Sequence, residues 1–329
     1  MAHPEQFQFV SGAGEFLPDY FFGNNGALLS GQTPRGADAD LDRRGLLTAG
    51  VSGLLCAPGA LAAGIPQHVE GDLGSLEREA GGRIGVAALN TATGLWLRHR
   101  ADERFALCSS FKALLAAVVL RAIDEGVMSG AGMIPYTEAD LVAYSPRTKA
   151  GLAAGEMSVF DLCAAAVEVS DNTAANLLLR RIGGPAGFTA SLRAMGDPTT
   201  RLDRYETDLN SNLPGDPRDT TTPAAFVRIL GRVLLGPALS DDARKRLTGW
   251  MIACETGRER LRAGLPKGWA AGDKTGTGER GAVNDVAIAW PPGRPPILIA
   301  VLMSGSGRPT PELSAAHARI ARVVAAALA

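Results

Sequence analysis

Three short motifs of the sequence combine residue types that can carry out acyl transfer on a serine. Ser109 and Lys112 form an S-x-x-K motif, Ser170 begins an S-D-N motif that ends at Asn172, and Lys274 begins K-T-G. An S-x-x-K arises about once by chance in a chain of this length, whereas S-D-N or K-T-G arises in only about one such chain in ten to thirty. The three motifs together therefore predict a serine acyl-transfer site assembled from three segments.

Lys112 is the residue best placed to activate the serine. A hydroxyl is a poor nucleophile until a neighbouring base takes its proton. On a helix, the amine of Lys112 lies one turn from the hydroxyl of Ser109 on the same face. The apolar run at 113–120 predicts a buried helix, and burial favours the neutral amine. Free N–H groups at the start of this helix also suit an oxyanion.

The four histidines do not suggest an alternative chemistry. His3, His68, His99 and His317 make no H-x-H, H-E-x-x-H or Cys/His spacing. We therefore expect neither a zinc site nor a Ser-His-Asp triad, and no metal or other cofactor. The formal net charge of −1, without a basic patch, predicts a small uncharged or anionic substrate and no nucleic-acid partner.

Residue for residue, these motifs resemble those of the class A serine β-lactamases, which are related to the penicillin-binding proteins. The resemblance runs from about residue 82 to the C-terminus. Residues 201–219 are similar to the family's Ω-loop and contain E-x-x-L-N from Glu206 to Asn210. The resemblance implies hydrolysis of the β-lactam ring of penicillins, cephalosporins or both through a serine acyl-enzyme, which confers antibiotic resistance.

Two other functions remain open. A D-alanyl-D-alanine peptidase of the penicillin-binding type shares the acylation motifs, but Glu206 with Asn210 argues against it. A non-catalytic envelope protein could keep the same fold, but the intact Ser109, Lys112 and Ser170 argue against that function.

The resemblance implies a role for each site residue. Ser109 is the nucleophile, and Lys112 and Glu206 are the candidate bases for acylation. Ser170 passes a proton to the departing nitrogen, and Glu206 with Asn210 activates the water for deacylation. The backbone N–H groups of Ser109 and Thr277 form the oxyanion hole. The substrate-binding residues are Asn172, Lys274, Thr275, Gly276, Thr277, Arg260 and Tyr144, and the residues that support the site are Asn176, Arg204 and Asp219.

Some positions depart from better-known members of the family. Val283 stands where many penicillinases have an arginine, and Arg260 occupies a position that supplies the substitute guanidinium in others. Cys108 precedes the nucleophile, but the partner position of the family's disulfide is Gly278, so we expect no bridge there. Cys163 and Cys254 have no evident partner. Free buried thiols are therefore expected.

The element pattern predicts an α/β protein of two lobes, with the site in the groove between them. One lobe is an antiparallel sheet flanked by helices, from residues 63–105 and 254–329. The other is mostly helical, from residues 106–253, and includes the Ω-loop. Ser158 and Pro185 are expected to start helices, and Gly183 and Gly184 to end one. The expected helices and strands of the sheet lobe are helix 66–81, strands 83–90, 95–99, 268–275, 282–290 and 297–303, and a helix from residue 309.

The N-terminal 62 residues have the form of an extension followed by a signal peptide. Arg43 and Arg44 precede a moderately apolar run to Leu61, with small residues at the cleavage spacing. The run is too short and too rich in glycine for a stable membrane anchor. The pattern predicts twin-arginine export of a monomeric enzyme to the periplasm or the medium.

Overall fold

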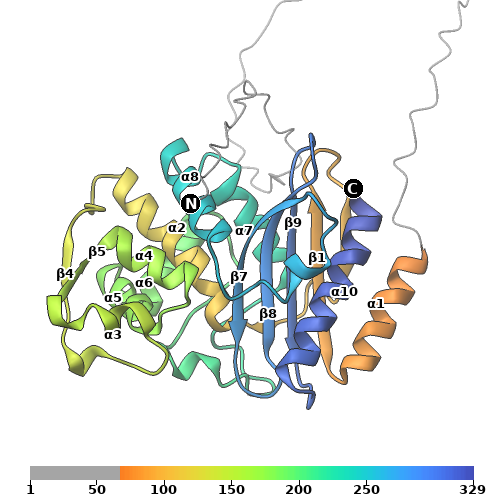
Figure 1. Ribbon diagram of the computed structural model, residues 1–329, viewed down its shortest axis with the longest axis horizontal. Helices are drawn as coiled ribbons and strands as arrows, with labels where there is room; N and C mark the ends of the chain where they lie inside the picture. Colours follow the sequence, from red (N-terminus) through yellow and green to blue (C-terminus); the bar gives the residue numbers. More distant parts are fainter. Residues whose placement is uncertain (1–66) are drawn as a thin grey trace, which may run out of the picture. The chain divides into compact units, whose positions relative to one another are not determined.

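A five-stranded antiparallel sheet organises the part of the chain that the computed structural model describes, residues 67–329 (Figure 1). The strand order is β2-β1-β9-β8-β7, and every neighbouring pair is antiparallel. The pairing of β8 with β9 confirms the prediction for the last two strands. The predicted signal segment lies outside the described residues. The strands are β1 (Arg83–Asn90), β2 (Trp96–His99), β7 (Ala270–Thr277), β8 (Val283–Trp290) and β9 (Ile297–Ser304).

Helices cover both faces of the sheet, which explains why its central strand β9 is apolar along almost its whole length. All eight residues of β9 are buried. Helices α1 (Gln67–Ala80) and α10 (Thr310–Leu328) pack against each other, and α10 also contacts β1, β2 and β8. Helix α7 (Pro223–Leu234) contacts β1 and β9. The sheet is therefore the middle layer of a three-layer core.

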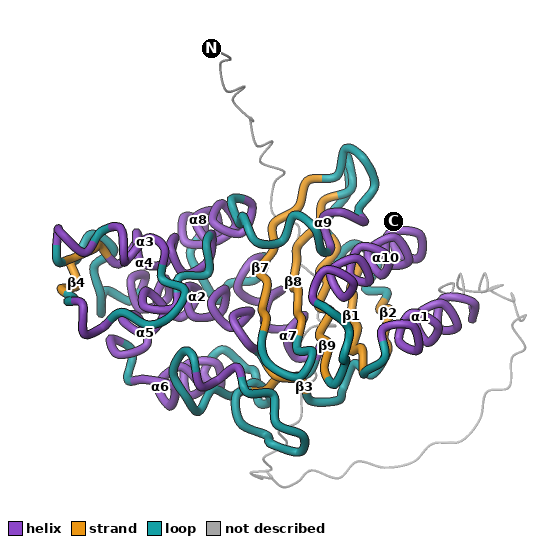
Figure 2. The backbone as a smooth tube through the Cα atoms, turned by 60° about the horizontal axis from the view of Figure 1, so that its bottom comes forward, coloured by secondary structure: helices purple, strands orange, loops and turns teal. Residues whose placement is uncertain are grey.

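Helix α2 (Phe111–Asp124) is the centre of the helical region. Its first ten residues are all buried, which confirms the prediction of a buried helix. It contacts helices α4, α5, α6 and α8 as well as strand β7. Figure 2 shows α2 to α6 grouped on one side of β7, with the other strands of the five-stranded sheet on the opposite side. The remaining helices are α3 (Pro146–Ala150), α4 (Val159–Glu168), α5 (Asn172–Arg181), α6 (Gly184–Ala194), α8 (Asp241–Ile252) and α9 (Leu261–Gly264).

Two short strand pairs complete the structure. Strand β3 (Phe105–Ala106) pairs with β6 (Thr220–Thr221), and β4 (Met133–Pro135) pairs with β5 (Glu156–Ser158). The β3–β6 pair joins the segment before α2 to the end of the Ω-loop. The division into lobes at residues 105 and 253 stays a prediction, because α7 lies within 106–253 and packs on the sheet.

Most predicted element ends agree with the structure to within two residues. Ser158 caps α4 by accepting a hydrogen bond from the N–H of Asp161, and Pro185 lies in the first turn of α6. Gly183 has a φ of 85° between α5 and α6, a conformation that glycine adopts readily. Strand β7 begins and ends two residues later than predicted, because residues 276 and 277 also pair with β8.

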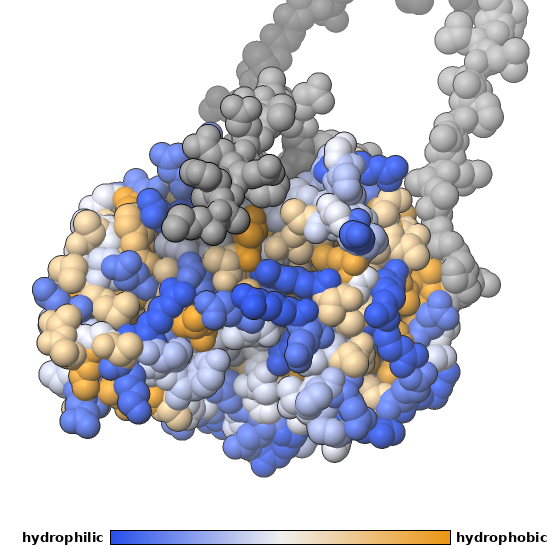
Figure 3. Space-filling model, viewed as in Figure 1, coloured by the Kyte–Doolittle hydropathy of each residue, from blue (hydrophilic) through white to orange (hydrophobic). Residues whose placement is uncertain are grey.

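The described residues contain no helix long and apolar enough to cross a membrane. On the face drawn in Figure 3, hydrophobic side chains lie in small groups among hydrophilic ones. The large exposed hydrophobic side chains of the described residues belong to separate segments of the chain: Val127, Met133, Tyr144, Tyr205, Leu213 and Ile252.

Candidate active site

The three predicted motifs line one pocket of about 370 Å³. That volume is within the range of pockets that bind small molecules. Helical segments supply the serines and Asn172, the Ω-loop supplies Asn210, and β7 supplies the K-T-G residues. The lining residues are Ser109, Tyr144, Ser170, Asn172, Asn210, Thr256, Arg260, Thr275, Gly276 and Thr277.

Ser109 lies in a short 3-10 turn, Cys108–Ser110, that continues directly into α2. The first N–H groups of a helix have no partner within the helix, although that of Ser110 here donates to the carbonyl oxygen of Leu107. Gly276 of β7 packs against the same turn. A Cβ at Gly276 would lie 2.9 Å from the carbonyl oxygen of Leu107 and 3.0 Å from the N of Ser110. Glycine is therefore required for β7 to approach the nucleophile this closely.

A carboxylate and an amine both contact the hydroxyl of Ser109. Ser109 Oγ donates a hydrogen bond to Glu206 Oε1 at 3.0 Å, and Lys112 Nζ donates to Ser109 Oγ at 2.9 Å. Lys112 Nζ also lies 3.0 Å from Glu206 Oε1, and both of these side chains are fully buried. A proton can therefore move among the three groups without a large displacement of any of them.

Burial lowers the pKa of Lys112, while the nearby Glu206 carboxylate acts in the opposite direction. Three further acceptors lie within hydrogen-bond distance of Lys112 Nζ, whose N–H groups can serve only some of them at once: the carbonyl oxygen of Ser170 at 2.9 Å, Ser170 Oγ at 3.4 Å, and Asn172 Oδ1. The amine thus links the S-x-x-K and S-D-N motifs.

The Ω-loop holds Glu206 through its backbone as well as its side chain. The Asn176 side chain donates to the carbonyl oxygen of Glu206 at 2.9 Å and accepts from its N–H at 3.0 Å. Asn210 Nδ2 donates to Glu206 Oε2 at 2.6 Å. The Glu206–Thr207 peptide is cis. The carboxylate therefore has a fixed position between the nucleophile and the Asn210 amide.

An ion pair joins the two ends of the Ω-loop. Arg204 Nε lies 2.6 Å from Asp219 Oδ2, and the Asp219 side chain is fully buried. Asp219 Oδ1 also accepts from the N–H groups of Asp203 and Arg204. Residues 203–204 and 219 are thereby fixed next to each other.

On the opposite side of the pocket, Lys274 contacts the second serine. Its Nζ donates to Ser170 Oγ at 3.1 Å and to the carbonyl oxygen of Thr275 at 2.9 Å. Lys274 is completely buried and does not line the pocket itself. Burial lowers its pKa to about 8. Lys274 therefore contacts the pocket indirectly, through its hydrogen bond to the lining residue Ser170.

Arg260 is a buried residue of the pocket wall, with only 6% of its surface exposed. Its Nη2 donates to Thr277 Oγ1 at 2.7 Å, and its Nη1 donates to the carbonyl oxygens of Gly276 and Asn284 at 2.9 and 2.6 Å. The guanidinium therefore lies beside the hydroxyl of Thr277 and is held from behind by two carbonyl groups.

Comparison with known proteins agrees with this geometry. Residues 69–328 match the β-lactamase enzyme family. The β-lactamase AST-1 of Nocardia asteroides is 49% identical over 253 residues, covering 77% of this chain and 81% of that protein. The carbapenem-hydrolysing β-lactamase KPC of Klebsiella oxytoca is 46% identical over 249 residues, covering 75% and 85%. A solved ancestral class A β-lactamase superposes with a TM-score of 0.78 at 51% identity, covering 79% of this chain and 99% of that one.

The chain belongs to the class A β-lactamases. The α/β fold with an antiparallel sheet, expected from the resemblance, is confirmed. The predicted catalytic and substrate-binding residues of this β-lactamase line the pocket or bond to a residue that does, whereas Asn176, Arg204 and Asp219 support the Ω-loop behind it. Tyr144 lies at the pocket's edge and is 62% exposed. Asn172 Nδ2 donates one hydrogen to the carbonyl oxygen of Ala143, and an amide nitrogen carries a second.

The three cysteines in the described part of this β-lactamase are buried free thiols, as predicted: Cys108, Cys163 and Cys254. Cys108 lies against the residue that occupies the expected disulfide position. A Cβ at Gly278 would be 2.7 Å from Cys108 Sγ. The described residues contain no cluster of three or more side chains that could hold a metal ion.

Sequence reasoning gave no role to Asp171, although it organises the S-D-N segment. Its buried carboxylate accepts from the N–H groups of Arg147, Thr148 and Ala174 at 2.8–2.9 Å. Asp171 is the N-cap of α5, and an aspartate directly before a helix is a signal for that position. No local sequence pattern indicated the hydrogen bonds from the N–H groups of Arg147 and Thr148, at the start of α3.

Sequence reasoning also missed Asn284 and Thr256. Asn284 Nδ2 donates to the carbonyl oxygens of Ala106 and Leu107 at 2.7 and 3.0 Å, just before the nucleophile. A polar residue within the buried strand β8 was the available signal. Thr256 lines the pocket and bonds Thr275 through their hydroxyls, and nothing in its local sequence marks it.

Proposed function

We propose a division of labour among these residues in the hydrolysis of β-lactams. As a class A β-lactamase, the chain opens the β-lactam ring through a serine acyl-enzyme and confers resistance. The contact of Ser109 Oγ with both Lys112 and Glu206 supports the roles that follow.

Acylation begins when Ser109 Oγ attacks the lactam carbonyl carbon and its proton passes to the buried pair of Lys112 and Glu206. The N–H groups of Ser109 and Thr277 stabilise the oxyanion. The carbon–nitrogen bond then breaks, and the nitrogen takes the proton of the Ser170 hydroxyl. Ser170 regains a proton from Lys112, whose Nζ lies 3.4 Å away. The ring is now open and esterified to Ser109.

Deacylation uses a water molecule held between Glu206 and Asn210. Glu206 takes a proton from this water, and the resulting hydroxide attacks the ester carbon. The bond to Ser109 Oγ breaks, and that oxygen recovers its proton from the Lys112 and Glu206 pair. The fixed position of the Glu206 carboxylate supports this role.

Substrate binding is assigned to the strand side of the pocket. Thr275 and Thr277 bind the substrate carboxylate with their hydroxyls, and Arg260 adds positive charge beside Thr277. Asn172 contacts the acylamino side chain with its second amide hydrogen. Tyr144 forms the wall at the entrance.

Glu206→Gln is the decisive test of the deacylation role. Glutamine keeps the shape of the side chain and one of its two acceptor oxygens but removes the base. Deacylation should slow by about 10² to 10⁴. Incubation with a good penicillin should then give a stable mass increase equal to the intact drug on the peptide that contains Ser109, measured by mass spectrometry.

Asp208→Asn is the matched control, because Asp208 is an exposed acid of the same loop. It should turn over like the parent enzyme and form no stable adduct. Ser109→Ala should abolish the adduct of the Glu206→Gln enzyme. Parental turnover by Glu206→Gln, without an adduct, would assign the activation of water to another residue.

We also propose that the enzyme is exported by the twin-arginine route as a monomer. The supporting residues, Arg43 and Arg44, lie outside the described part of the chain. Changing both to lysine should leave active enzyme in the cytoplasm, whereas Arg35→Lys should not. Normal export of the double variant would exclude this route.

The oligomeric state is tested separately. Light scattering of the mature enzyme should give the mass of one chain, and twice that mass would exclude the monomer.

A further inference from the structure

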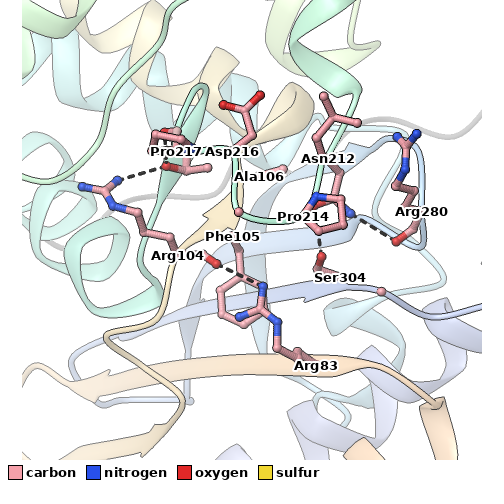
Figure 4. Close-up of a pocket in the computed structure, with 14 residues that line it drawn as sticks. Arg83, Arg104, Phe105, Ala106, Asn212, Pro214, Asp216, Pro217, Arg280 and Ser304 are labelled. Atoms are coloured by element: carbon pink, nitrogen blue, oxygen red, sulfur yellow. Dashed lines mark hydrogen bonds between the residues drawn. The ribbon is translucent and has the colours of Figure 1, made fainter.

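A second pocket of about 440 Å³ lies beneath the end of the Ω-loop (Figure 4). Its residues come from β1, the segment around β3, the Ω-loop at 212–217, the β7–β8 turn and the end of β9. None of them lines the active-site pocket. Its volume suits a small molecule. The pocket is therefore a separate candidate binding site, which we call the Ω-loop pocket.

The apolar surface of the Ω-loop pocket comes from the Ω-loop. Leu213 is 41% exposed, and it lines the pocket together with Pro214 and Pro217. The Phe105 ring is buried beneath Arg83, whose guanidinium carbon lies 4.5 Å from the ring centre. These surfaces suit a ring or a short apolar chain.

Three arginines surround this apolar surface. Figure 4 shows Arg104 and Arg280 on opposite sides of the pocket, with Arg83 between them against Phe105. Two of the three are already neutralised, because Arg83 pairs with Glu103 and Arg280 pairs with Glu279.

Arg104 has no such neutralising partner. It makes no ion pair with any acid of residues 67–329, and its Nη1 donates only to the carbonyl oxygen of Thr199 and to Thr220 Oγ1. The one carboxylate that lines the pocket, Asp216, is itself bonded to Arg218. Arg104 therefore keeps donors and a full positive charge for a ligand.

We propose that the Ω-loop pocket binds a small organic anion whose carboxylate pairs with Arg104 while its apolar body packs against Leu213, Pro214 and Pro217. A guanidinium binds a carboxylate through two parallel hydrogen bonds, so a planar carboxylate fits its fork. Arg83 and Arg280 are paired with their own acids, so Arg104 supplies the positive charge for the ligand. A neutral ligand would leave the Arg104 charge unused, and a bare anion would leave the apolar surface uncovered.

The occupied pocket acts on deacylation, an effect that rests on the proposed role of Glu206. Asn212 Nδ2 donates to the carbonyl oxygens of Glu279 and Arg280 at 3.1 Å. The N–H of Glu279 donates to the carbonyl oxygen of Asn210, whose side chain holds Glu206. A ligand that displaces Asn212 or Arg280 therefore loosens the residue that positions the carboxylate.

Binding is tested with benzoate, benzamide and acetate as probes. Benzoate has both an aromatic ring and a negative charge, benzamide has only the ring, and acetate has only the charge. Amide chemical shifts of the full mature enzyme should change saturably with benzoate in the roughly millimolar range expected for so small a ligand. The changes should concentrate at residues 104–106, 213–217 and 280. Benzamide and acetate should bind at least about fivefold more weakly, because each lacks one of the two contacts.

Arg104→Gln should weaken benzoate binding about tenfold, as expected for the loss of a charged hydrogen bond. Arg308→Gln, at an exposed arginine outside this pocket, should not change it. Equal binding by Arg104→Gln and the parent, or shifts centred on residues 109, 144 and 170, would overturn the proposed site. This result does not depend on turnover and can be repeated in Ser109→Ala.

The effect on deacylation is measured separately, with a penicillin whose deacylation limits kcat. Saturating benzoate should lower kcat by about twofold or more in the parent and not in Arg104→Gln. Competition at the active site would instead raise KM and leave kcat unchanged. An unchanged kcat, with binding at Arg104 demonstrated, would overturn the regulatory part of the proposal.

Discussion

The two sides of the active-site pocket each bury a lysine, but in different surroundings. On the helix side, Lys112 lies 3.0 Å from the carboxylate of Glu206. On the strand side, Lys274 bonds a hydroxyl and a carbonyl oxygen, and neither it nor Arg260 makes an ion pair with an acid of residues 67–329. Both lysines are completely buried.

This difference separates two tasks. A base and an acid in contact can exchange a proton, which suits the helix side to acylation and deacylation. Cations without an acidic partner keep their charge available to an anion, which suits the strand side to a substrate carboxylate. One residue type thus serves two functions because its neighbours differ.

Lys112→Met should have the largest effect. Methionine fills much of the same volume but cannot accept a proton, so the acylation rate should fall by about 10² to 10⁴. Stopped-flow measurement of acylation provides the rate. Lys149→Met, at an exposed lysine, is the control and should acylate normally. Normal acylation by Lys112→Met would leave Glu206 as the only acylation base.

Arg260→Ala should have an intermediate effect. Removing a charged hydrogen-bond donor beside Thr277 should lower kcat/KM for carboxylate-bearing substrates by roughly 1.5–3 kcal/mol, mainly through KM. Arg258→Ala removes an exposed arginine two residues earlier and should leave kcat/KM unchanged. Equal values for the two variants would show that Arg260 has a structural role and does not act on the substrate.

The pH dependence of Lys274 should be the smallest effect. Its pKa of about 8 means that its charge is present below pH 8 and is lost as the pH rises through that value. The kcat/KM for carboxylate-bearing substrates should therefore fall at alkaline pH. Lys274→Arg keeps the charge and should move this fall to higher pH. An unchanged pH profile would assign the fall to another group.

The residues that meet around Ser109 could be found in the sequence because each lies in a short motif, and their catalytic roles stay a prediction. Ser109 with Lys112 and Glu206 with Asn210 are three and four residues apart, so local spacing indicates their relation. Ser109 and Glu206 are 97 positions apart in the sequence, and only the family resemblance indicated that they act at one site. Long apolar runs, such as the one that forms β9, likewise predicted strands directly.

The contacts that the sequence did not predict depend on distant partners. Asp171 was recognisable as a helix cap, but its bonds to Arg147 and Thr148 depend on where the distant helix α3 begins. The end of β7 was placed too early because glycine and threonine at 276 and 277 give little local indication of a strand. Their pairing with β8 determines the strand end instead.

Asn284 has a consequence for the order in which the enzyme matures on the ribosome. Its side chain supports the carbonyl groups of Ala106 and Leu107 and accepts a hydrogen bond from the N–H of Met303. The hydrogen bonds that hold the segment before Ser109 can therefore form completely only when strands β8 and β9, made some 180 to 200 residues later, have joined the sheet. A nascent chain that ends before β8 carries Ser109, Lys112 and Glu206 without the Asn284 side chain, and one that ends before β9 lacks the Met303 N–H that holds Asn284 in place, so the complete support arrives with the last strand to be synthesised.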